Sequence, residues 1–269
     1  MAVIFRVLFV LIIVYLLLLL PRLGHPGWEK LSGFRYAHRG LHNKEKGIPE
    51  NSMSAFRLAV EHGYGAELDV HLLKDGRLAV FHDSTLKRIC GTDGTVEELT
   101  VADLANYHLL GTEETIPLFE DVLAVFEGKT PLIIELKSVN GNAAPLTDAV
   151  MKVLKDWNGT YCIESFHPAV VRHLKKHYPH VIRGQLSENF FKGGSVTGMK
   201  AFMMTFLLTT LFTRPDFIAY AHQHRSNISL RIMRKLYGVH EVGWTIREQP
   251  VMEKLEKDGV VPIFENFVP

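Results

Sequence analysis

Two stretches, AELDVH (66–71) and PLIIELK (131–137), decide the fold of this sequence. Each is short, β-rich and largely apolar, as expected of a buried strand. Runs of this kind alternate with amphipathic helical stretches, which is the pattern of βα units around a parallel sheet. The predicted strands span residues 35–40, 66–71, 131–137, 161–166, 181–186, 216–221, 241–246 and 260–266. Eight such strands predict a closed (β/α)8 barrel, the TIM barrel of the α/β class.

A further strand is predicted at LAVFHD (78–83). It follows Asp75 and Gly76, a pair that is typical of a tight turn between antiparallel strands. We therefore expect this strand to form a hairpin with the strand at 66–71.

The charge balance argues against a dedicated nucleic-acid binder. The 269 residues include 30 Lys or Arg and 29 Asp or Glu, so the formal net charge is only +1. Such a chain lacks the strong positive field that nucleic-acid binding uses. Cys90 and Cys162 are the only cysteines. They exclude a disulfide framework and a cysteine-rich zinc site, although a single disulfide stays open. No protein partner can be inferred.

The N-terminus predicts a membrane anchor. Residues 7–20 are an unbroken apolar run, which residues 2–5 extend past the single Arg6. Together they comprise about twenty residues, roughly one bilayer crossing. The run ends in PRLGHP (21–26) rather than in the small residues of a signal-peptide cleavage site. We expect residues 1–24 to be an uncleaved single-pass anchor helix at the membrane. Basic residues flank the run on both sides, so the side of the membrane stays undetermined.

The barrel domain is expected to span residues 33–269 and to contain an unusual insertion. MKAFMMTFLLTTLF (199–212) is apolar on nearly every face, although an amphipathic outer helix is expected there. Helices of this kind are usually buried or in lipid. Two interpretations remain open, a well-covered barrel helix and a helix at the membrane. The glycine-rich FFKGGSVTG (190–198) before it is expected to be a connection.

Two histidines lie at the ends of predicted strands. His38 lies at the end of the first strand in AHRG, and His82 lies at the end of the hairpin strand in FHD. Active sites of (β/α) barrels form at the C-terminal ends of the strands. One histidine there is as often structural as functional, but two with acids at neighbouring strand ends favour acid/base catalysis.

Three carboxylates in the predicted strands form a candidate ion site. Glu67 and Asp69 are two residues apart, so their side chains lie on one face of the strand. Glu135 lies in the next apolar strand, two residues before Lys137. Buried carboxylates need a countercharge, and an all-oxygen set suits Mg2+ or Ca2+ better than zinc. The alternative is a buried ion pair between Glu135 and Lys137.

Arg39 and Lys137 add positive charge beside this predicted ion. With the metal, they can neutralise the oxygens of a phosphate group. A metal, two acid/base histidines and two phosphate-binding cations are what a phosphodiester hydrolase needs.

The sequence resembles the glycerophosphodiester phosphodiesterases over residues 35 to 266. The motifs that carry the resemblance are, in order, HRG (38–40), PENS (49–52), ELDVH (67–71), FHD (81–83), IPLFEDVL (116–123), IELK (134–137), ESF (164–166) and GWT (243–245). The resemblance implies a TIM barrel that hydrolyses glycerophosphodiesters to an alcohol and glycerol 3-phosphate. It also implies catalysis by the two histidines, one bound divalent cation, and phosphate contacts from the Arg and Lys.

The resemblance implies two further site residues and one departure. Glu50 matches an acidic position that orients Arg39 or approaches the metal, and Trp244 matches an aromatic that lines the glycerol side of the substrate. The last strand ends in FEN (264–266), where many family members carry an aspartate. This difference affects expected rim contacts, but not the catalytic set. We expect three more histidines to line the site, namely His167, His222 and His224.

Other functions share much of this chemistry. The anchor and the apolar insertion favour access to lipid, so lysophospholipids cleaved in lysophospholipase D fashion are an alternative substrate. A lyase whose phosphate product stays cyclic would use the same barrel. A non-catalytic barrel that binds lipid headgroups at the membrane is an alternative from a different class.

Overall fold

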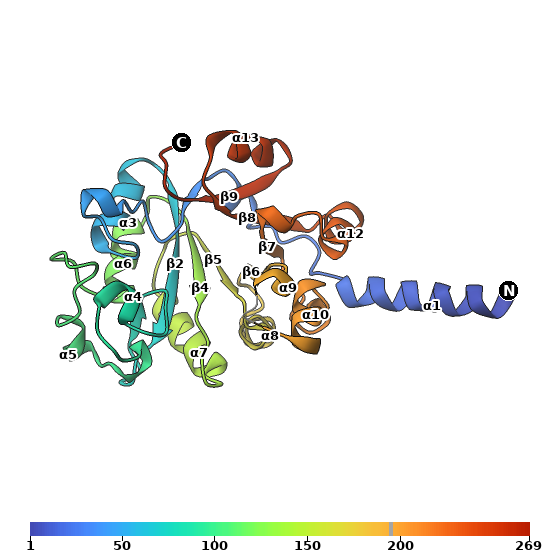
Figure 1. Cartoon of the computed structure of the whole chain (residues 1–269), viewed down its shortest axis with the longest axis horizontal. Coiled ribbons are helices and arrows are strands. Elements are labelled where there is room, and N and C mark those ends of the chain that lie inside the picture. Colours follow the sequence, from blue (N-terminus) through green and yellow to red (C-terminus); the bar gives the residue numbers. More distant parts are fainter. Residues whose placement is uncertain (194–195) are drawn as a thin grey trace.

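The computed structural model describes residues 1–193 and 196–269 and confirms the (β/α)8 barrel (Figure 1). In this described part of the chain, eight parallel strands form a closed ring, because β1 pairs with both β9 and β2. The barrel strands are β1 (Tyr36–Ala37), β2 (Gly65–Leu72), β4 (Leu132–Leu136), β5 (Tyr161–Ser165), β6 (Arg183–Ser187), β7 (Phe217–Ala221), β8 (His240–Ile246) and β9 (Val260–Phe264). The predicted hairpin is also present, since β3 (Leu78–Val80) pairs antiparallel with β2.

Helices surround this ring and follow most strands. The α-helices are α1 (Ala2–Leu19), α2 (Glu29–Ser32), α3 (Met53–Glu61), α4 (Lys87–Cys90), α5 (Val101–Leu104), α6 (Phe119–Phe126), α7 (Ala143–Leu154), α8 (Pro168–His177), α9 (Phe190–Gly193), α10 (Gly198–Thr205), α11 (Thr210–Thr213), α12 (Ile228–Tyr237) and α13 (Gln249–Lys257). Short 3-10 helices are η1 (Lys44–Lys46), η2 (Val96–Glu98) and η3 (His222–His224).

The first strand is shorter than the predicted 35–40. It ends at Ala37, because Arg39 and Gly40 adopt positive φ angles of 55° and 78° and turn the chain. A Cβ atom on Gly40 would lie 2.9 Å from the backbone carbon of Ala55, so the close approach to α3 requires a glycine there. This turn places His38 and Arg39 directly at the end of the barrel.

The apolar insertion at 199–212 is helical but is not one helix. It forms α10 and α11, separated by Leu207, which has a φ of 57° and is fully buried. Leu207 packs in a cluster with Leu19 of α1, so burial of this side chain accompanies the break. Of the glycine-rich connection predicted at 190–198, residues 194–195 lie outside the described residues.

The strands divide the barrel interior into an apolar and a charged half. Alternation on β4 turns Leu132, Ile134 and Leu136 towards the surrounding helices, and Ile133 and Glu135 inward. Near the N-terminal ends, the inward side chains form an apolar cluster that includes Tyr36, Ile133, Cys162, Phe217, Val242, Val261 and Ile263. Further along the strands, Asp69, Glu135 and Glu164 are neighbours in register on β2, β4 and β5. Charged groups therefore collect at the C-terminal end.

Trp28 closes the opposite, apolar end of the barrel. It precedes α2, is buried, and stacks on His240 with ring centroids 4.6 Å apart. Its ring also packs against Phe217, at a centroid distance of 5.2 Å. The segment between α1 and β1 thus completes the barrel core.

Helix α1 projects from the barrel beside α10 and α12 (Figure 1). Among the described residues it is the one helix long and apolar enough to cross a membrane, a property that a signal sequence shares. Its last turns are docked on the barrel. The Tyr15 hydroxyl lies 2.7 Å from Ser229 Oγ, and the Tyr237 hydroxyl donates to the carbonyl of Leu16 at 2.8 Å. Leu19 is completely buried.

Candidate active site

The three predicted ligand carboxylates meet at the C-terminal end of the barrel. Glu67 and Asp69 lie on β2 and Glu135 lies on β4, paired in register with Asp69. One oxygen from each of the three lies within 4.8 Å of the others, and all three side chains are buried. The structure therefore brings together the residues that the sequence analysis selected for the ion.

The charges of this cluster fit a divalent cation. Burial, and after it the charges of Asp69 and Glu135, raises the pKa of Glu67 well above its usual range. The surrounding Lys and Arg groups therefore do not fully compensate three carboxylates at this depth. Carboxylate oxygens are the ligands that Mg2+ and Ca2+ prefer, so an ion placed among these three residues would supply the missing charge.

Lys137 is the main protein countercharge at the cluster. Its Nζ lies 2.8 Å from Glu135 Oε1 and 2.9 Å from Asp69 Oδ1. Burial disfavours the ammonium, but these two carboxylates outweigh it and raise the pKa of Lys137. The ion pair that was the alternative to a metal site is thus present, and it joins two of the three candidate ligands. Lys137 lies where it could contact a phosphate next to a bound ion.

Arg39 is held by neighbouring acids. Its Nη1 donates to Glu50 Oε1 at 2.6 Å, and its backbone N–H donates to Glu67 Oε2 at 3.1 Å. Its Nε lies 3.5 Å from Asp69 Oδ2. Of the two expectations for Glu50, the contact with Arg39 is present. The neighbouring Asn51 donates from Nδ2 to Asp69 Oδ2 at 2.8 Å, a contact that the sequence analysis missed.

His38 is oriented by Glu265, which follows the last strand. The His38 Nδ1 atom lies 2.5 Å from Glu265 Oε2, and Nε2 lies 3.9 Å from Glu67 Oε2. A carboxylate only accepts here, so Nδ1 carries the proton and Nε2 faces the carboxylate cluster. Burial lowers the pKa of His38, although the bond to Glu265 opposes this. Glu265 lies in the segment 264–266, where the sequence departs from the family pattern, and it is the partner of His38.

His82 has a matching arrangement with its own neighbour. Its Nδ1 lies 2.6 Å from Asp83 Oδ1, and its Nε2 makes no hydrogen bond to the part of the chain that the structure describes. Burial lowers the pKa of His82 to about 4, and the positive charges of Lys137 and Arg39 act in the same direction. Both candidate catalytic imidazoles thus have a carboxylate on Nδ1 and a tendency towards the neutral form.

Arg88, on α4, links the partners of Arg39 and His82. It donates from Nη1 and Nη2 to the two carboxylate oxygens of Glu50, both at 2.8 Å. It donates from Nε to Asp83 Oδ2 at 2.6 Å and from Nη2 to Asp83 Oδ1 at 3.0 Å. Arg88 is not among the predicted site residues, because nothing in the sequence of a short helix after β3 indicates that it lies over two site residues.

A cavity of about 360 Å3 adjoins the carboxylate cluster. Glu135 and Lys137 line one end, and the remaining wall is largely apolar, with Phe166, Phe190, Val196 and Met204 among its residues. Trp244, predicted to line the substrate, packs edge-on against Phe166 at a centroid distance of 5.5 Å.

The three additional histidines predicted as lining have different surroundings. His167 lines this cavity and caps α8 by accepting from the Ala169 backbone N–H at 3.3 Å. His224 accepts from the Asn189 backbone N–H at 3.2 Å, and His222 begins η3 after β7.

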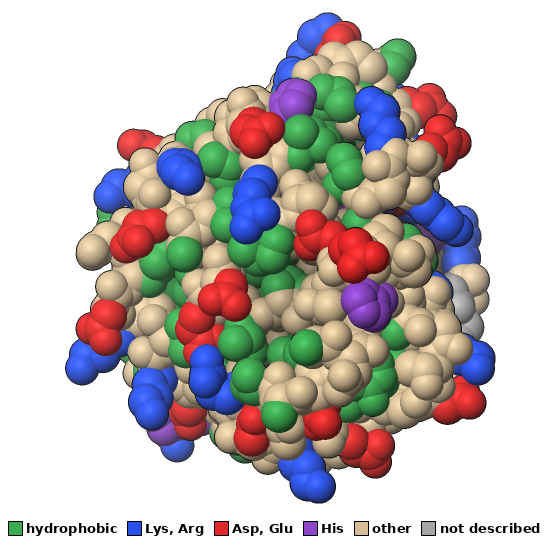
Figure 2. Space-filling model, turned by 90° about the vertical axis from the view of Figure 1, so that its left-hand side faces the viewer, with side chains coloured by type: hydrophobic (Ala, Val, Ile, Leu, Met, Phe, Trp, Pro, Cys, Tyr) green, Lys and Arg blue, Asp and Glu red, His purple; other side chains and the backbone are tan. Residues whose placement is uncertain are grey.

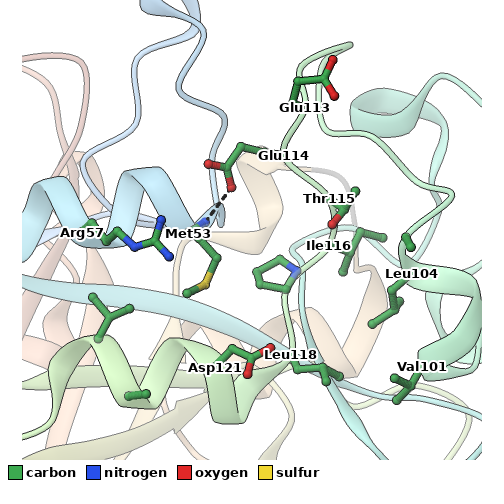
Figure 3. Close-up of a pocket in the computed structure, with 14 residues that line it drawn as sticks. Met53, Arg57, Val101, Leu104, Glu113, Glu114, Thr115, Ile116, Leu118 and Asp121 are labelled. Atoms are coloured by element: carbon green, nitrogen blue, oxygen red, sulfur yellow. Dashed lines mark hydrogen bonds between the residues drawn. The ribbon is translucent and has the colours of Figure 1, made fainter.

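A larger cavity, of about 780 Å3, lies outside the barrel (Figure 3). Its lining comes from α3, α5, α6 and the segment 113–118, and it includes none of the predicted site residues. Glu114 reaches across to α3, where Oε2 accepts from the Met53 backbone N–H at 3.1 Å (Figure 3). Its size alone would favour this cavity as the active site, but the candidate catalytic residues lie elsewhere.

A model of the glycerophosphoryl diester phosphodiesterase family matches residues 38–269. The chain belongs to this family. A glycerophosphodiester phosphodiesterase of Caldanaerobacter subterraneus subsp. tengcongensis is 30% identical over 236 residues, which cover 83% of this chain and 90% of that protein. The enzyme class is therefore that of the phosphoric diester hydrolases, which argues against the non-catalytic barrel.

Other relatives extend this comparison. The lysophospholipase D GDPD1 of Homo sapiens is 32% identical over 54% of this chain and 48% of its own length. The structure of an Oleispira antarctica phosphodiesterase in complex with the product sn-glycerol-3-phosphate aligns with a TM-score of 0.69 at 23% identity, over 87% of this chain and 94% of that one. This likeness supports the barrel fold.

Replacing Arg88 with Met should lower turnover of glycerophosphocholine roughly ten- to a hundredfold, the usual cost of removing a partner of site residues. Glu50 and Asp83 would lose a shared donor, and the side chains that they hold would be less well oriented. Lys87→Met is the matched control, because the exposed Lys87 pairs only with the exposed Asp93 in the described residues. Equal choline release by the two variants would contradict a positioning role for Arg88.

Proposed function

We propose that His38 and His82 act as the acid/base pair in hydrolysis of glycerophosphodiesters to an alcohol and glycerol 3-phosphate. The observation that supports this most directly is that each imidazole has Nδ1 held by a carboxylate while Nε2 makes no hydrogen bond within the described residues, beside a buried carboxylate cluster. The free nitrogen of one histidine can remove the proton from the attacking hydroxyl, and the other can protonate the departing alcohol. If the neighbouring glycerol hydroxyl attacks, a cyclic phosphate forms and is hydrolysed with the two roles exchanged.

The surroundings of the histidines suit this alternation. Burial lowers the pKa of both, which favours the neutral imidazole needed for a base. An anionic phosphodiester bound between them would raise their pKa values, because a nearby negative charge stabilises the imidazolium. One of the pair could then hold the proton that the leaving alcohol needs.

Glu67, Asp69 and Glu135 would hold one divalent cation, Mg2+ or Ca2+. When bound, such an ion contributes charge stabilisation at the phosphoryl oxygens. Arg39 and Lys137 would bind the same oxygens from the protein side. Glu50 would keep Arg39 in position through their 2.6 Å hydrogen bond.

Trp244 would lie against the glycerol part of the substrate. It is close to the cavity through its contact with Phe166, and its buried Nε1 has no hydrogen-bond partner within the described residues. The Trp244 Nε1–H group could donate a hydrogen bond to a glycerol hydroxyl.

We also propose that residues 1–24 anchor the enzyme to a membrane and that residues 33–269 form the catalytic domain. The support is the length and apolar composition of α1 together with its exposure along most of its length. Burial of Leu19 and the hydrogen bonds from Tyr237 and Arg214 to the end of α1 would hold the anchor to the barrel.

A second candidate substrate is a lysophospholipid cleaved on the headgroup side. The observation that favours it is the largely apolar cavity that opens beside Glu135 and Lys137, because its wall would favour an acyl chain over the hydroxyl groups of glycerol. The beginning of an acyl chain would fit a cavity of about 360 Å3 lined by Phe166, Phe190 and Met204.

Replacing either His38 or His82 with Ala should reduce phosphodiester hydrolysis by about two to four orders of magnitude, the range for loss of an acid/base group. Choline release from glycerophosphocholine measures the effect. Circular dichroism and calorimetric ion binding should stay close to those of the unchanged protein. His62→Ala, on the exposed end of α3, is the control. Unchanged turnover in both site variants would exclude this mechanism.

Asp69→Asn should weaken cation binding at least tenfold, since it removes the charge at the centre of the buried ligand set. Isothermal titration of chelator-treated protein with Mg2+ and with Ca2+ gives the affinities, and activity restored by each ion identifies the effective one. The exposed Asp93→Asn serves as the control. Full activity of protein shown by elemental analysis to be free of metal would refute the ion site.

The lysophospholipid proposal predicts choline release from lysophosphatidylcholine by the detergent-solubilised protein. Val196→Trp should narrow the cavity, so hydrolysis of the lysolipid should fall several-fold while that of glycerophosphocholine is retained. A lysolipid that remains intact with the unchanged protein would eliminate this substrate class.

A further inference from the structure

Exposed apolar side chains outside α1 gather on the helices at its base. We define the apolar collar as Met199 and Phe202 of α10, Phe212 of α11, and Ile228 and Leu236 of α12, whose exposures range from 43% to 72%. The other large apolar side chains that are exposed outside α1, within the described residues, are Met1, Leu23, Phe191 and Val268. A concentration of this kind is a mark of an interaction surface.

The attachment of α1 to the barrel fixes where the collar would lie relative to a bilayer that α1 crosses. The 18 residues of α1 span about 27 Å, close to the roughly 30 Å of a hydrocarbon core. Its last turns are bound to the barrel through Tyr15, Leu16 and Leu19. The helix therefore has no free length to hold the barrel away from the membrane. If α1 crosses the bilayer, the surface around its base must lie at the lipid boundary.

Helix α12 has the pattern of an interfacial helix on the side facing α1. Ile228, Ile232 and Leu236 are spaced four residues apart and so form one row. Ile232 packs against the cluster that contains Leu19, which turns this row towards α1. Arg231 and Lys235 are exposed on the same face. Apolar rows flanked by basic residues bind the boundary between headgroups and acyl chains.

The charge of this region also favours anionic lipid. Residues 190–237 contain seven Lys or Arg but a single acidic residue, Asp216, which is buried, whereas the whole chain has a net charge of +1. Arg225 and Arg234 pair with Glu241. The exposed basic side chains are Lys192, Lys200, Arg231 and Lys235.

The opposite face of the molecule differs from the collar. Figure 2 views the side away from α1, where Lys, Arg, Asp and Glu are distributed among apolar and neutral side chains. Acidic and basic groups are mixed on this face, so neither lipid tails nor anionic headgroups would be favoured. The asymmetry between the two faces gives the barrel a defined orientation at a membrane.

We propose that the apolar collar and these basic residues form a membrane-facing surface that seats the barrel on an anionic bilayer. Helix α10 carries Met199 and Phe202 of the collar, and its Lys200 and Met204 line the cavity beside the candidate active site. Lipid substrates would thus enter the cavity from the bilayer. A second copy of the chain is a poor occupant, because a symmetric contact would bring like charges together. The proposal rests on the membrane anchor and not on the catalytic mechanism.

Site-specific fluorescence can test the surface with the full chain in vesicles of phosphatidylcholine and phosphatidylglycerol. In a Cys90→Ser background, NBD labels would be attached to the collar after Phe212→Cys or Leu236→Cys. A label after Asp93→Cys, on a distant loop, is the exposed control. A label after Leu11→Cys reports on α1. Cys162 is buried and should not react. Labels at Phe212 and Leu236 should be quenched several-fold more by doxyl lipids than the label at Asp93, and less by aqueous iodide.

The outcomes separate the proposals. A lipid-exposed label at Leu11 with water-exposed collar labels would overturn the membrane-facing surface but leave the anchor intact. A water-exposed label at Leu11 would overturn the anchor and the surface together. Collar labels shielded from both quenchers would indicate a protein partner and would likewise overturn the bilayer as occupant.

The role of Arg231 and Lys235 in binding anionic lipid can be tested by an activity measurement. The double substitution Arg231→Gln and Lys235→Gln should reduce, several-fold, the preference for lysolipid in phosphatidylglycerol vesicles over phosphatidylcholine vesicles. Turnover of soluble glycerophosphocholine should not change, which keeps this test separate from the catalytic proposal. Lys44→Gln with Lys46→Gln, in the exposed η1, is the control. An unaltered lipid preference in the α12 variant would contradict the proposed surface.

Discussion

The confinement of three carboxylates at one end of the barrel is the constraint on which the rest of the site depends. Glu67, Asp69 and Glu135 are buried, with oxygens within 4.8 Å of one another. Because the site is buried, water screens their mutual repulsion only weakly. The barrel tolerates this because Lys137 and Arg39 are placed among them. A divalent ion would complete the compensation. The mutual repulsion of the three carboxylates would thus favour binding of the ion.

Charge compensation continues outward from this cluster in alternating layers. Arg39 is paired with Glu50, Glu50 with Arg88, and Arg88 with Asp83, which holds His82. On the other side, His38 is held by Glu265, which also pairs with Arg247. Arg88 makes bidentate pairs with both Glu50 and Asp83, and such guanidinium–carboxylate pairs permit few geometries. The tautomers of His38 and His82 are therefore set by Glu265 and Asp83, which lie at the periphery of the site.

The sequence predicted the strands and the clustering of three carboxylates well, since both follow from local spacing. The period of two along β2 and β4 is enough to place Glu67 with Asp69 and to turn Glu135 inward. The short first strand was not predicted, because positive φ angles at Arg39 and Gly40 depend on the approach of α3. The break at Leu207 was also missed; Leu207 packs there in a cluster with Leu19 of α1, nearly two hundred residues away.

The sequence by itself determined the barrel, the apolar helix at its N-terminus and the identity of the groups that could do chemistry, because alternation, hydropathy and residue type are properties of short segments. Only the tertiary structure decided which groups act on one another. Glu265 meets His38 because ring closure places β9 beside β1, and Arg88 reaches Glu50 because α4 lies over the turn after β1. The apolar collar likewise exists only where α10, α11 and α12 surround the base of α1. Such contacts join residues that are far apart in the chain, so no local sequence pattern predicts them.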